Sequence, residues 1–444
     1  MLVDTILQKR TKKRGIVALL LWSATVINYL DRTNLSVAAP VLSKQFHITP
    51  TEMGIILSAF FWSYALFQIP SGWFADKIGQ RVTFAFAVTW WSLATAAMAL
   101  GRGVGSFIGI RVIMGLGEAS VYPCSVGVTS KWFRDNERVK VTALFDSGAR
   151  VGTAVTMPLV VWLMTKFSWE LPFIVSGAIG VVWAVIWLWY YRDPEKHKYI
   201  NQAELNYIRE GQVKHDGVDN EIPLKWYQLL YYRNIWMMTI GFFMLSYSIY
   251  FFITWMPTYL VQARGMKLMT MGFVAMIPPL AAIVAELFGG WLSDYLYSKG
   301  LSLTAARKVN LVGGMLLATT IGFSALVHSA VMCVVLLTIS YCGLVIAASA
   351  ILALPGDIAP KNMASVVTGI ENFGSNMGGV LGPIITGFVV ATTHSFVPAL
   401  VLSSIIAFGG ALVFLFGLGK IEPLNPEKVL FRNQTMQNRK AVSE

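Results

Sequence analysis

Long apolar segments alternate with short polar segments along the whole chain. A helix that crosses a membrane needs about 20 consecutive, mostly apolar residues. Segments of this kind lie approximately at residues 16–40, 52–73, 82–101, 105–128, 141–165, 170–191, 235–262, 269–292, 309–328, 330–355, 365–391 and 396–418. The pattern predicts an all-α integral membrane protein with twelve transmembrane helices.

The composition supports this class. Hydrophobic residues make up 55% of the 444 residues and charged residues 13%, whereas a soluble domain carries about 25% charged residues. The segment 16–40 is too long for a cleaved signal peptide, so we expect it to remain as the first span.

The basic residues are distributed unevenly between the two sides of the predicted membrane. Most of the 35 Lys and Arg residues lie in segments that share one side. The opposite side holds Lys44, Arg102, Lys166, Arg264 and Lys267. By the positive-inside rule, both termini are expected in the cytoplasm of a multi-pass inner-membrane protein. The net charge of +12 therefore reports topology and implies no nucleic-acid partner.

The second half of the chain repeats the first. Residues 290–294 echo residues 72–76, and Gly374 and Gly378 match Gly148 and Gly152. Two six-helix halves of the same sense form a parallel repeat. We expect an N-terminal half at 1–191, a central cytoplasmic loop at 192–233 with a short surface helix near 202–210, and a C-terminal half with a short cytoplasmic tail at 234–444. The basic segment 1–15 is expected to act as a cytoplasmic anchor.

Two charged residues stand side by side within the first span, Asp31 and Arg32. A charge at this depth costs at least about 2.5–3.5 kcal/mol, so such residues usually have a function. The alternative is that the two merely neutralise each other. Neighbouring positions of a helix do not face each other, however, so we expect each to bind a partner from another helix.

Spans 4 and 5 carry further charges. Arg111 and Glu118 are seven residues apart and share one helix face, but about 10 Å of rise prevents direct contact. We interpret them as two separate functional charges rather than an inert pair. Asp146 and Arg150 are in register for a mutual salt bridge, which is equally consistent with a structural and a substrate-reading role.

Uncharged polar groups mark spans 2 and 11. Tyr64 and Gln68 lie on one face of span 2, where Tyr64 either contacts a ligand or packs between helices. Span 11 carries Glu371, Asn372 and Asn376, and its two asparagines form a polar stripe. The roles of Glu371 and of Glu286 in span 8 stay open. Asp357 is expected in a turn, and most aromatic residues, Trp91 included, at interfaces or in packing.

Signals for enzyme chemistry are missing from the sequence. The cysteines show no metal-site or disulfide spacing, the histidines lie in loops or at span ends, and no phosphate-binding loop is present. We expect no enzyme, no metal and no cofactor.

The segment between spans 2 and 3 carries a specific motif. Gly72, Asp76, Lys77, Gly79 and Arg81 are spaced as in the cytoplasmic loop motif of the major facilitator superfamily, which this segment resembles. We expect this segment to form a cytoplasmic gate, with its charges able to pair across helix ends and its glycines allowing a tight turn and close approach.

Further stretches point to one family. Matching segments lie at residues 28–35, 58–60, 68–73, 115–119, 132–133, 137–138, 254–255, 259–260 and 359–360. With them the chain resembles the anion:cation symporter family of the major facilitator superfamily, in particular its bacterial sugar-acid branch of galactonate and glucarate/galactarate transporters.

The resemblance implies proton-coupled uptake of a carboxylated sugar, with protons as the only coupling species. Asp31 and Glu118 match the family's protonatable pair, and Arg32 matches the arginine that meets the substrate carboxylate. The other residues expected to line the site are Tyr29, Tyr64, Arg150, Asn372 and Asn376, with Arg111, Asp146 and Glu371 as supporting charges.

The chain also departs from the galactonate branch. Ala149 stands where that branch has a glutamine, and Glu286 and Glu371 replace apolar residues. The expected partners are a small carboxylate substrate, such as an aldonate, aldarate or hexuronate, and the lipid bilayer, for a monomeric carrier. Open alternatives are a sodium-coupled anion carrier of the same fold and a membrane sensor of sugar acids that does not transport.

Overall fold

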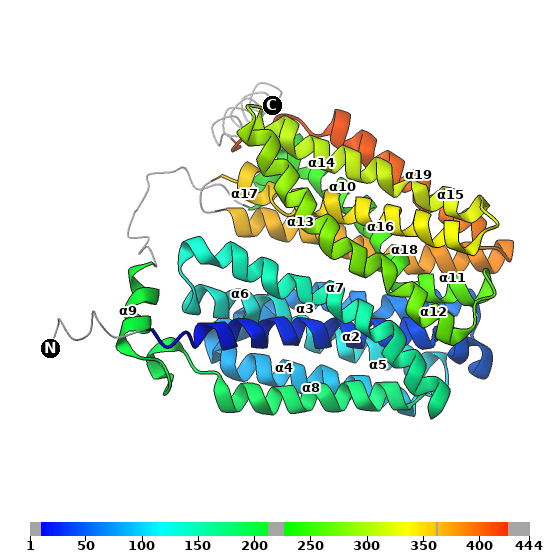
Figure 1. Cartoon of the computed structure of the whole chain (residues 1–444), viewed down its shortest axis with the longest axis horizontal. Helices are drawn as coiled ribbons and strands as arrows, with labels where there is room; N and C mark the ends of the chain where they lie inside the picture. Colours follow the sequence, from blue (N-terminus) through cyan, green and yellow to red (C-terminus); the bar gives the residue numbers. More distant parts are fainter. Residues whose placement is uncertain (1–9, 212–225, 361–362, 425–444) are drawn as a thin grey trace, which may run out of the picture. The chain divides into compact units, whose positions relative to one another are not determined.

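All regular structure in the residues described, 10–211, 226–360 and 363–424 of a computed structural model, is helical. In chain order the longer helices are α2 (Arg14–Phe46), α3 (Pro50–Ile78), α4 (Gln80–Ala97), α5 (Val104–Glu118), α6 (Val121–Trp132), α7 (Asp135–Lys166), α8 (Leu171–Tyr190), α9 (Gln202–Glu210), α10 (Arg233–Thr254), α11 (Met256–Gln262), α12 (Leu268–Ala275), α13 (Ile277–Ser298), α14 (Leu303–Ala318), α15 (Thr320–Leu326), α16 (Ala330–Ile351), α17 (Leu354–Ile358), α18 (Ala364–Thr393) and α19 (Val397–Leu412) (Figure 1). Four short helices complete the set, η1 (Met98–Leu100), η2 (Pro194–Lys196), η3 (Trp226–Tyr231) and η4 (Val413–Gly417).

The predicted all-α membrane fold is confirmed. In the described part of the chain, ten helical segments are long and apolar enough to cross a membrane, or eleven if Pro50–Gln68 and Pro70–Ile78, which meet at 51°, form one span. The predicted first span, α2, is not among them because polar side chains fill its middle. With 33 residues it is about 50 Å long, which exceeds the thickness of the hydrocarbon core.

Several predicted spans contain a short interruption of the helix. The spans expected at 105–128, 235–262, 269–292, 309–328 and 330–355 are each built from two consecutive helices. Four of these pairs, Val104–Trp132, Leu268–Ser298, Leu303–Leu326 and Ala330–Ile358, still form single segments long enough to cross a membrane. Pro257 and Pro355 occupy the first turns of α11 and α17, where a missing N–H costs nothing. Hydropathy could not reveal these breaks, because the residues around them stay apolar.

The described residues form two compact units. The first comprises the described parts of Met1–Asp216, Ile253–Leu280 and Pro383–Ser395, and the second those of Gly217–Phe252, Ala281–Gly382 and Phe396–Glu444. The division into halves at 1–191 and 234–444, read from the sequence repeat, stays a prediction.

Glycines bring α7 against α2 in the first unit. A Cβ atom at Gly148 would lie 2.7 Å from the carbonyl oxygen of Trp22, and one at Gly152 would lie 2.5 Å from that of Val26. Any side chain at these positions would push the two helices apart. The small residues therefore fix the position of the polar middle of α2 beside α7.

The matched glycines of α18 do the same against α10 in the second unit. A Cβ atom at Gly374 would clash with the carbonyl oxygen of Thr239, and one at Gly378 would lie 2.7 Å from the backbone nitrogen of Tyr247. The glycines that match in sequence therefore also match in packing. Each pair brings its helix into close contact with the first long helix of its own unit.

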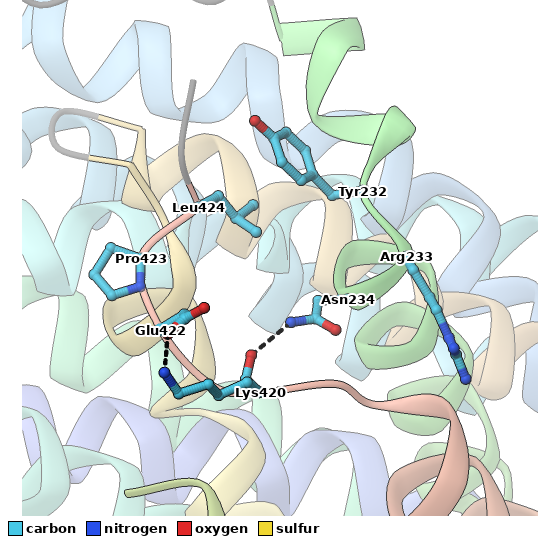
Figure 2. Close-up of a pocket in the computed structure, with 7 residues that line it drawn as sticks. All are labelled: Tyr232, Arg233, Asn234, Lys420, Glu422, Pro423 and Leu424. Atoms are coloured by element: carbon cyan, nitrogen blue, oxygen red, sulfur yellow. Dashed lines mark hydrogen bonds and ion pairs between the residues drawn. The ribbon is translucent and has the colours of Figure 1, made fainter. Parts of the chain in front are cut away.

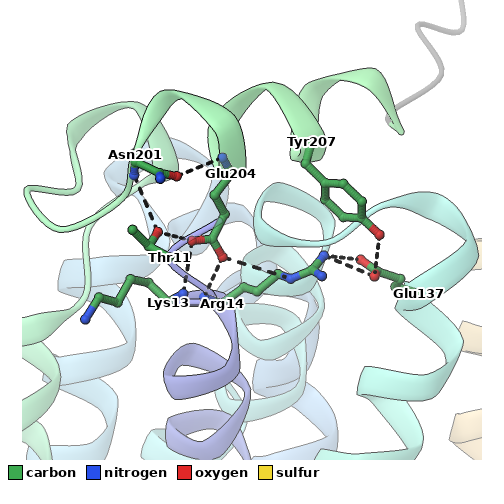
Figure 3. Close-up of polar contacts among 7 residues, drawn as sticks. All are labelled: Thr11, Lys13, Arg14, Glu137, Asn201, Glu204 and Tyr207. Atoms are coloured by element: carbon green, nitrogen blue, oxygen red, sulfur yellow. Dashed lines mark hydrogen bonds and ion pairs between the residues drawn. The ribbon is translucent and has the colours of Figure 1, made fainter. Parts of the chain in front are cut away.

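The helix α9, in the expected cytoplasmic loop, docks on the start of α2 (Figure 3). Its Glu204 is fully buried and accepts hydrogen bonds from the Thr11 hydroxyl and from the backbone N–H groups of Lys13 (3.1 Å) and Arg14 (3.3 Å). Since α2 has no side-chain cap of its own, Glu204 satisfies donors that would otherwise be unpaired. The predicted helix at 202–210 is confirmed, and the basic segment before α2 is a docking element as well as an expected anchor.

A second set of contacts ties α9 to α7. Arg14 forms an ion pair with Glu137 at 2.8 Å, and the Tyr207 hydroxyl donates to the same carboxylate at 3.0 Å (Figure 3). The guanidinium groups of Arg14 and Arg134 lie 4.4 and 4.0 Å from the centre of the Tyr207 ring. The three helices α2, α7 and α9 therefore meet in one charged junction.

Candidate functional site

Arg32 of α2 and Glu118 of α5 form a buried ion pair. The Arg32 Nε atom lies 2.6 Å from a Glu118 carboxylate oxygen, and the side chains are 9% and 0% exposed. A charge-assisted bond of this length is strong, and it offsets part of the cost of burying both charges. In this structure the predicted substrate-binding arginine is therefore held by one of the two predicted proton carriers.

Asp31 turns to a different helix. Its Oδ2 atom accepts a hydrogen bond of 3.0 Å from the indole N–H of Trp91 in α4, and the residue is 2% exposed. One oxygen of each acid, Asp31 Oδ1 and Glu118 Oε1, has no hydrogen-bond partner within the described residues. Each acid therefore keeps an oxygen on which a proton can bind.

Aromatic rings surround the Arg32 guanidinium. Its central carbon lies 5.1 Å from the ring centre of Tyr29, 4.6 Å from that of Phe60 and 4.7 Å from that of Tyr64. Ring faces attract a desolvated cation, so they help to keep Arg32 charged inside the protein. Gln68 donates to the Tyr64 hydroxyl at 3.2 Å, so the two polar groups expected on one face of span 2 bind each other.

Arg111 adds a second cation to this group. It is 3% exposed, its guanidinium lies 5.0 Å from the centre of the Phe60 ring, and its Nη2 atom donates to the Leu57 carbonyl at 3.4 Å. It acts electrostatically on Glu118 from α5 itself. With Asp31, Arg32 and Glu118 it forms what we call the charge cluster, with two acids and two cations.

Asp146 and Arg150 of α7 form the predicted salt bridge at 2.7 Å. Their side chains are 34% and 14% exposed, so the pair is more open than the charge cluster. Both residues act electrostatically on the Tyr29 phenol, as Arg32 does. Tyr29 thus interacts with both this pair and Arg32. Whether Arg150 binds a substrate stays a prediction.

The residues expected from span 11 lie in the second unit, on α18. Glu371 is fully buried, Asn376 is 7% exposed and Asn372 is half-buried. The structure describes this unit by itself, so the expected joint site with the charge cluster stays a prediction.

The charges of the loop motif, expected to be able to pair across helix ends, make other contacts in this structure. Lys77 lies over the Trp73 ring at 4.6 Å, and Arg81 donates to the carbonyl of Leu188 at 2.5 Å, while Asp76 has no ion pair within the described part of the chain. The backbone of Gly79 has a φ of +95°, which a glycine adopts without strain, so the expected tight turn is present.

Gly72 in the same motif is not a site of close approach. The nearest atom to a Cβ atom placed there is 3.9 Å away, on Pro123. The role of the motif as a cytoplasmic gate stays a prediction.

Sequence reasoning missed two residues that contact the charge cluster and one ion pair in the second unit. Trp91 and Phe60 were expected only to pack, yet one binds Asp31 and the other contacts both cluster arginines. Asp357 lies in α17 rather than in a turn and pairs with Arg307 at 2.8 Å. The only sequence signal for Trp91 was that two tryptophans stand side by side in a span. Nothing in the sequence indicated that Asp357 contacts Arg307.

Two hollows lie outside the charge cluster. One, of about 250 Å³, opens at the start of α10 and is lined by Tyr232, Arg233, Asn234, Lys420, Glu422, Pro423 and Leu424 (Figure 2). Its Lys420–Glu422 ion pair is exposed to solvent. The other, of about 530 Å³, has mostly apolar walls from α3, α4 and α5, with Ser120 just after α5. Neither contains a cluster residue. Within the described residues no three His, Cys, Asp or Glu side chains could hold a metal ion.

Comparison with known proteins identifies the family to which this architecture belongs. Residues 21–383 match the family model of the Major Facilitator Superfamily. The chain belongs to the Major Facilitator Superfamily. It is 36% identical to the D-galactonate transporter of Escherichia coli O6:H1, over 93% of this chain and 97% of that protein. It is 35% identical to a probable galactarate/D-glucarate transporter of Bacillus subtilis, over 93% of this chain and 94% of that protein.

This superfamily member is also 33% identical to the hexuronate transporter of Bacillus subtilis, over 91% of this chain and 93% of that protein. It therefore falls in the sugar-acid branch and is a multi-pass membrane transporter rather than an enzyme. Its fold matches a crystal structure of a bacterial homologue of the human lysosomal transporter Spinster, with a TM-score of 0.74, 17% identity and coverage of 91% of this chain and 96% of that one.

Proposed function

We propose that the chain is a proton-coupled symporter that imports a sugar acid by alternating access. The observation that carries the proposal is the buried Arg32–Glu118 pair at 2.6 Å. One residue is the cation that a carboxylated substrate needs, and the other is an acid that releases this cation when it takes up a proton. Carrier function in the inner membrane, as a monomer with both termini in the cytoplasm, is part of the same proposal.

The charge cluster explains how proton and substrate would be coupled. With both acids ionised, Asp31 and Glu118 balance Arg32 and Arg111. A proton on Glu118 removes the partner of Arg32 and leaves a positive charge in a site of low dielectric constant. A substrate carboxylate restores the balance, because Arg32 offers it a planar, two-pronged donor. Proton and anion thus favour each other's binding.

The membrane potential determines how many protons must accompany the substrate for uptake into the cell. A carboxylate that enters a negatively charged cytoplasm is opposed by about 2.3 kcal/mol per charge for each 100 mV. At least one proton must accompany each carboxylate to cancel this cost, and a further proton makes uptake electrically driven. Release of protons from Asp31 and Glu118 inside would return Arg32 to Glu118 and reset the carrier.

The substrate class is proposed from the relatives. The names of these transporters refer to an aldonate, aldarates and hexuronates, all of which combine a carboxylate with several hydroxyl groups. An arginine surrounded by aromatic rings, beside a second buried arginine, suits a ligand of this kind. A carboxylated sugar fits both observations.

Reconstituted protein tests the proposal. Uptake of labelled aldonates, aldarates and hexuronates into proteoliposomes is measured under a proton gradient alone and under a sodium gradient alone. We expect a proton gradient to drive accumulation and a sodium gradient to leave it unchanged. Uptake driven only by sodium would make the chain a sodium-coupled carrier, and saturable binding without flux would make it a sensor.

A further inference from the structure

Glu371 occupies an unusual position in the second unit. It lies one turn before Gly374 and Ser375 of α18, both of which contact α10, so it shares the helix face that packs on α10. The residue is fully buried, and neither of its carboxylate oxygens has a hydrogen-bond partner within the described residues. It differs in this from Asp31 and Glu118, which each bind a neighbour through one oxygen.

The cations among the described residues of this unit are engaged elsewhere. Arg233 at the start of α10 donates to the carbonyl of Phe416, Arg307 pairs with Asp357, and Lys308 donates to carbonyls after α19. Lys299 lies over the Tyr295 ring, and Lys420 pairs with Glu422. Within the described residues α16, α18 and α19 carry no Lys or Arg. No charged side chain of the described chain acts electrostatically on Glu371.

The titratable groups of the two packed helices are few. Besides Arg233, α10 carries only Tyr247 and Tyr250, and α18 carries only Glu371. An ionised carboxylate with neither counter-ion nor hydrogen bond is too costly inside a membrane protein, so such a group is neutralised. Since every described cation of its own unit has another contact, the neutralising species is a proton.

We propose that Glu371 is a second proton-coupling site, additional to Asp31 and Glu118. The inference rests on the proposed proton symport. An O–H bond forms on a Glu371 oxygen with a proton from the outer aqueous phase, and it breaks when α18 admits cytoplasmic water, which takes the proton. The carboxylate left behind is then reprotonated in the next cycle.

The extra proton determines how many carboxylates a substrate can carry and still be accumulated against its gradient. With two protons, a substrate carrying two carboxylates moves without net charge and gains nothing from the membrane potential. A third proton gives the cycle one net positive charge, so the potential drives uptake. Glu371 therefore suits the carrier to doubly charged sugar acids of the aldarate class.

The test compares two acid-to-amide variants under an imposed potential. Proteoliposomes containing wild type, Glu371→Gln or Glu286→Gln accumulate a labelled aldarate at a potential of about 100 mV, inside negative. One charge fewer per cycle lowers the limiting accumulation ratio roughly 50-fold, which we expect for Glu371→Gln only. Glu286, on α13 of the same half, is the matched control, since it is a half-buried acid with a partner. Equal accumulation by wild type and Glu371→Gln would overturn the inference.

Infrared spectroscopy gives a readout that does not depend on transport. At neutral pH the wild type should show a carbonyl band of a protonated carboxyl group that Glu371→Gln lacks and Glu286→Gln keeps. Glu371→Met replaces the acid with an apolar side chain of similar length and serves if the amide variant does not fold. An unchanged band in both Glu371 variants overturns the inference. Uptake by wild type that ignores the proton gradient overturns the proposed function itself, which keeps the two failures apart.

Discussion

Arg32 Nε and Glu118 Oε2 lie 2.6 Å apart, so the proposed substrate-binding cation is paired with an acid of the proposed coupling pair. A substrate carboxylate can approach Arg32 only in competition with Glu118. Protonation of Glu118 ends this competition without moving either helix. The coupling of two ligands thus reduces to one side-chain contact, which makes it accessible to single substitutions.

The first prediction concerns the geometry of the anchor. Arg32→Lys keeps the charge but replaces a planar fork with a point charge. We expect the apparent affinity for substrate to fall at least tenfold, with the protein still folded. The matched control is Arg102→Lys, on an exposed loop. An apparent affinity near that of wild type in Arg32→Lys would remove Arg32 from the binding site.

A second prediction separates binding from coupling. Asp31→Asn and Glu118→Gln mimic the protonated acids, so both should bind substrate and exchange it across the membrane. Neither should accumulate substrate under a proton gradient. Counterflow and gradient-driven uptake, measured on the same proteoliposomes, provide the two readouts. Accumulation at the wild-type level in either variant would contradict the assigned role.

The third prediction concerns the cap that Glu204 places on α2. Glu204→Ala removes the acceptor of two backbone N–H groups and should destabilise the protein by about 1–2 kcal/mol, as the loss of a helix N-cap does. Glu210→Ala, at the exposed end of α9, is the control and should change the free energy of unfolding by less than about 0.5 kcal/mol. Thermal unfolding of the purified variants distinguishes the two; equal melting temperatures would mean that α9 does not stabilise α2.

A fourth prediction follows from His197 in the segment between α8 and α9. It is 5% exposed, and its Nδ1 accepts a hydrogen bond from the Tyr199 backbone N–H at 3.3 Å, which requires an unprotonated Nδ1. Burial lowers the pKa of His197 below its usual value, and the charges of Lys13 and Arg192 lower it further. The folded state therefore favours the neutral imidazole.

The sign of the pH effect follows from linkage. The unfolded chain takes up a proton on His197 near pH ~6.5, before the folded chain does. This part of the stability is present above that pH and is lost as the pH falls from about 6.5 toward the lowered pKa. Melting temperatures between pH 5 and 8 should drop less on the acid side in His197→Gln. His328→Gln, at an exposed loop position, should retain the wild-type profile.

The sequence was most informative about the charged residues that lie within an apolar span. Asp31 and Arg32 could be expected to bind different partners, because adjacent helix positions point apart, and the structure gives them Trp91 and Glu118. The identity of Trp91 could not be predicted, since an indole in a membrane span usually packs or lies at an interface. A contact between helices far apart in sequence leaves no local signal.

The same limit applies outside the membrane. The helix at 202–210 was visible in its polar pattern, but the burial of Glu204 under the start of α2 was not, because a glutamate on a short polar helix normally faces water. The glycines of α7 and α18 were recognisable by their repeat, but that they perform equivalent packing became visible only in the structure.

The last prediction resolves the role of the Asp146–Arg150 pair. If the two residues only neutralise each other, Arg150→Ala leaves a carboxylate without its partner and lowers the melting temperature, and the double variant Asp146→Ala/Arg150→Ala largely restores it. The partial exposure of both side chains limits the size of this effect to about 1 kcal/mol or less. If Arg150 reads a second carboxylate or a hydroxyl of the substrate, the double variant folds well and does not transport.

The position of the pair favours the second outcome. Arg150 lies on the α7 helix that glycines press against α2, and it acts on the Tyr29 phenol, which also faces Arg32. A substrate carboxylate on Arg32 would therefore extend toward Arg150 past Tyr29. Melting temperature and uptake in the three variants decide the matter, because a double variant that transports like the wild type assigns the pair to structure alone. Residual uptake in Arg150→Ala should shift toward substrates with a single carboxylate, which Arg32 can hold without help.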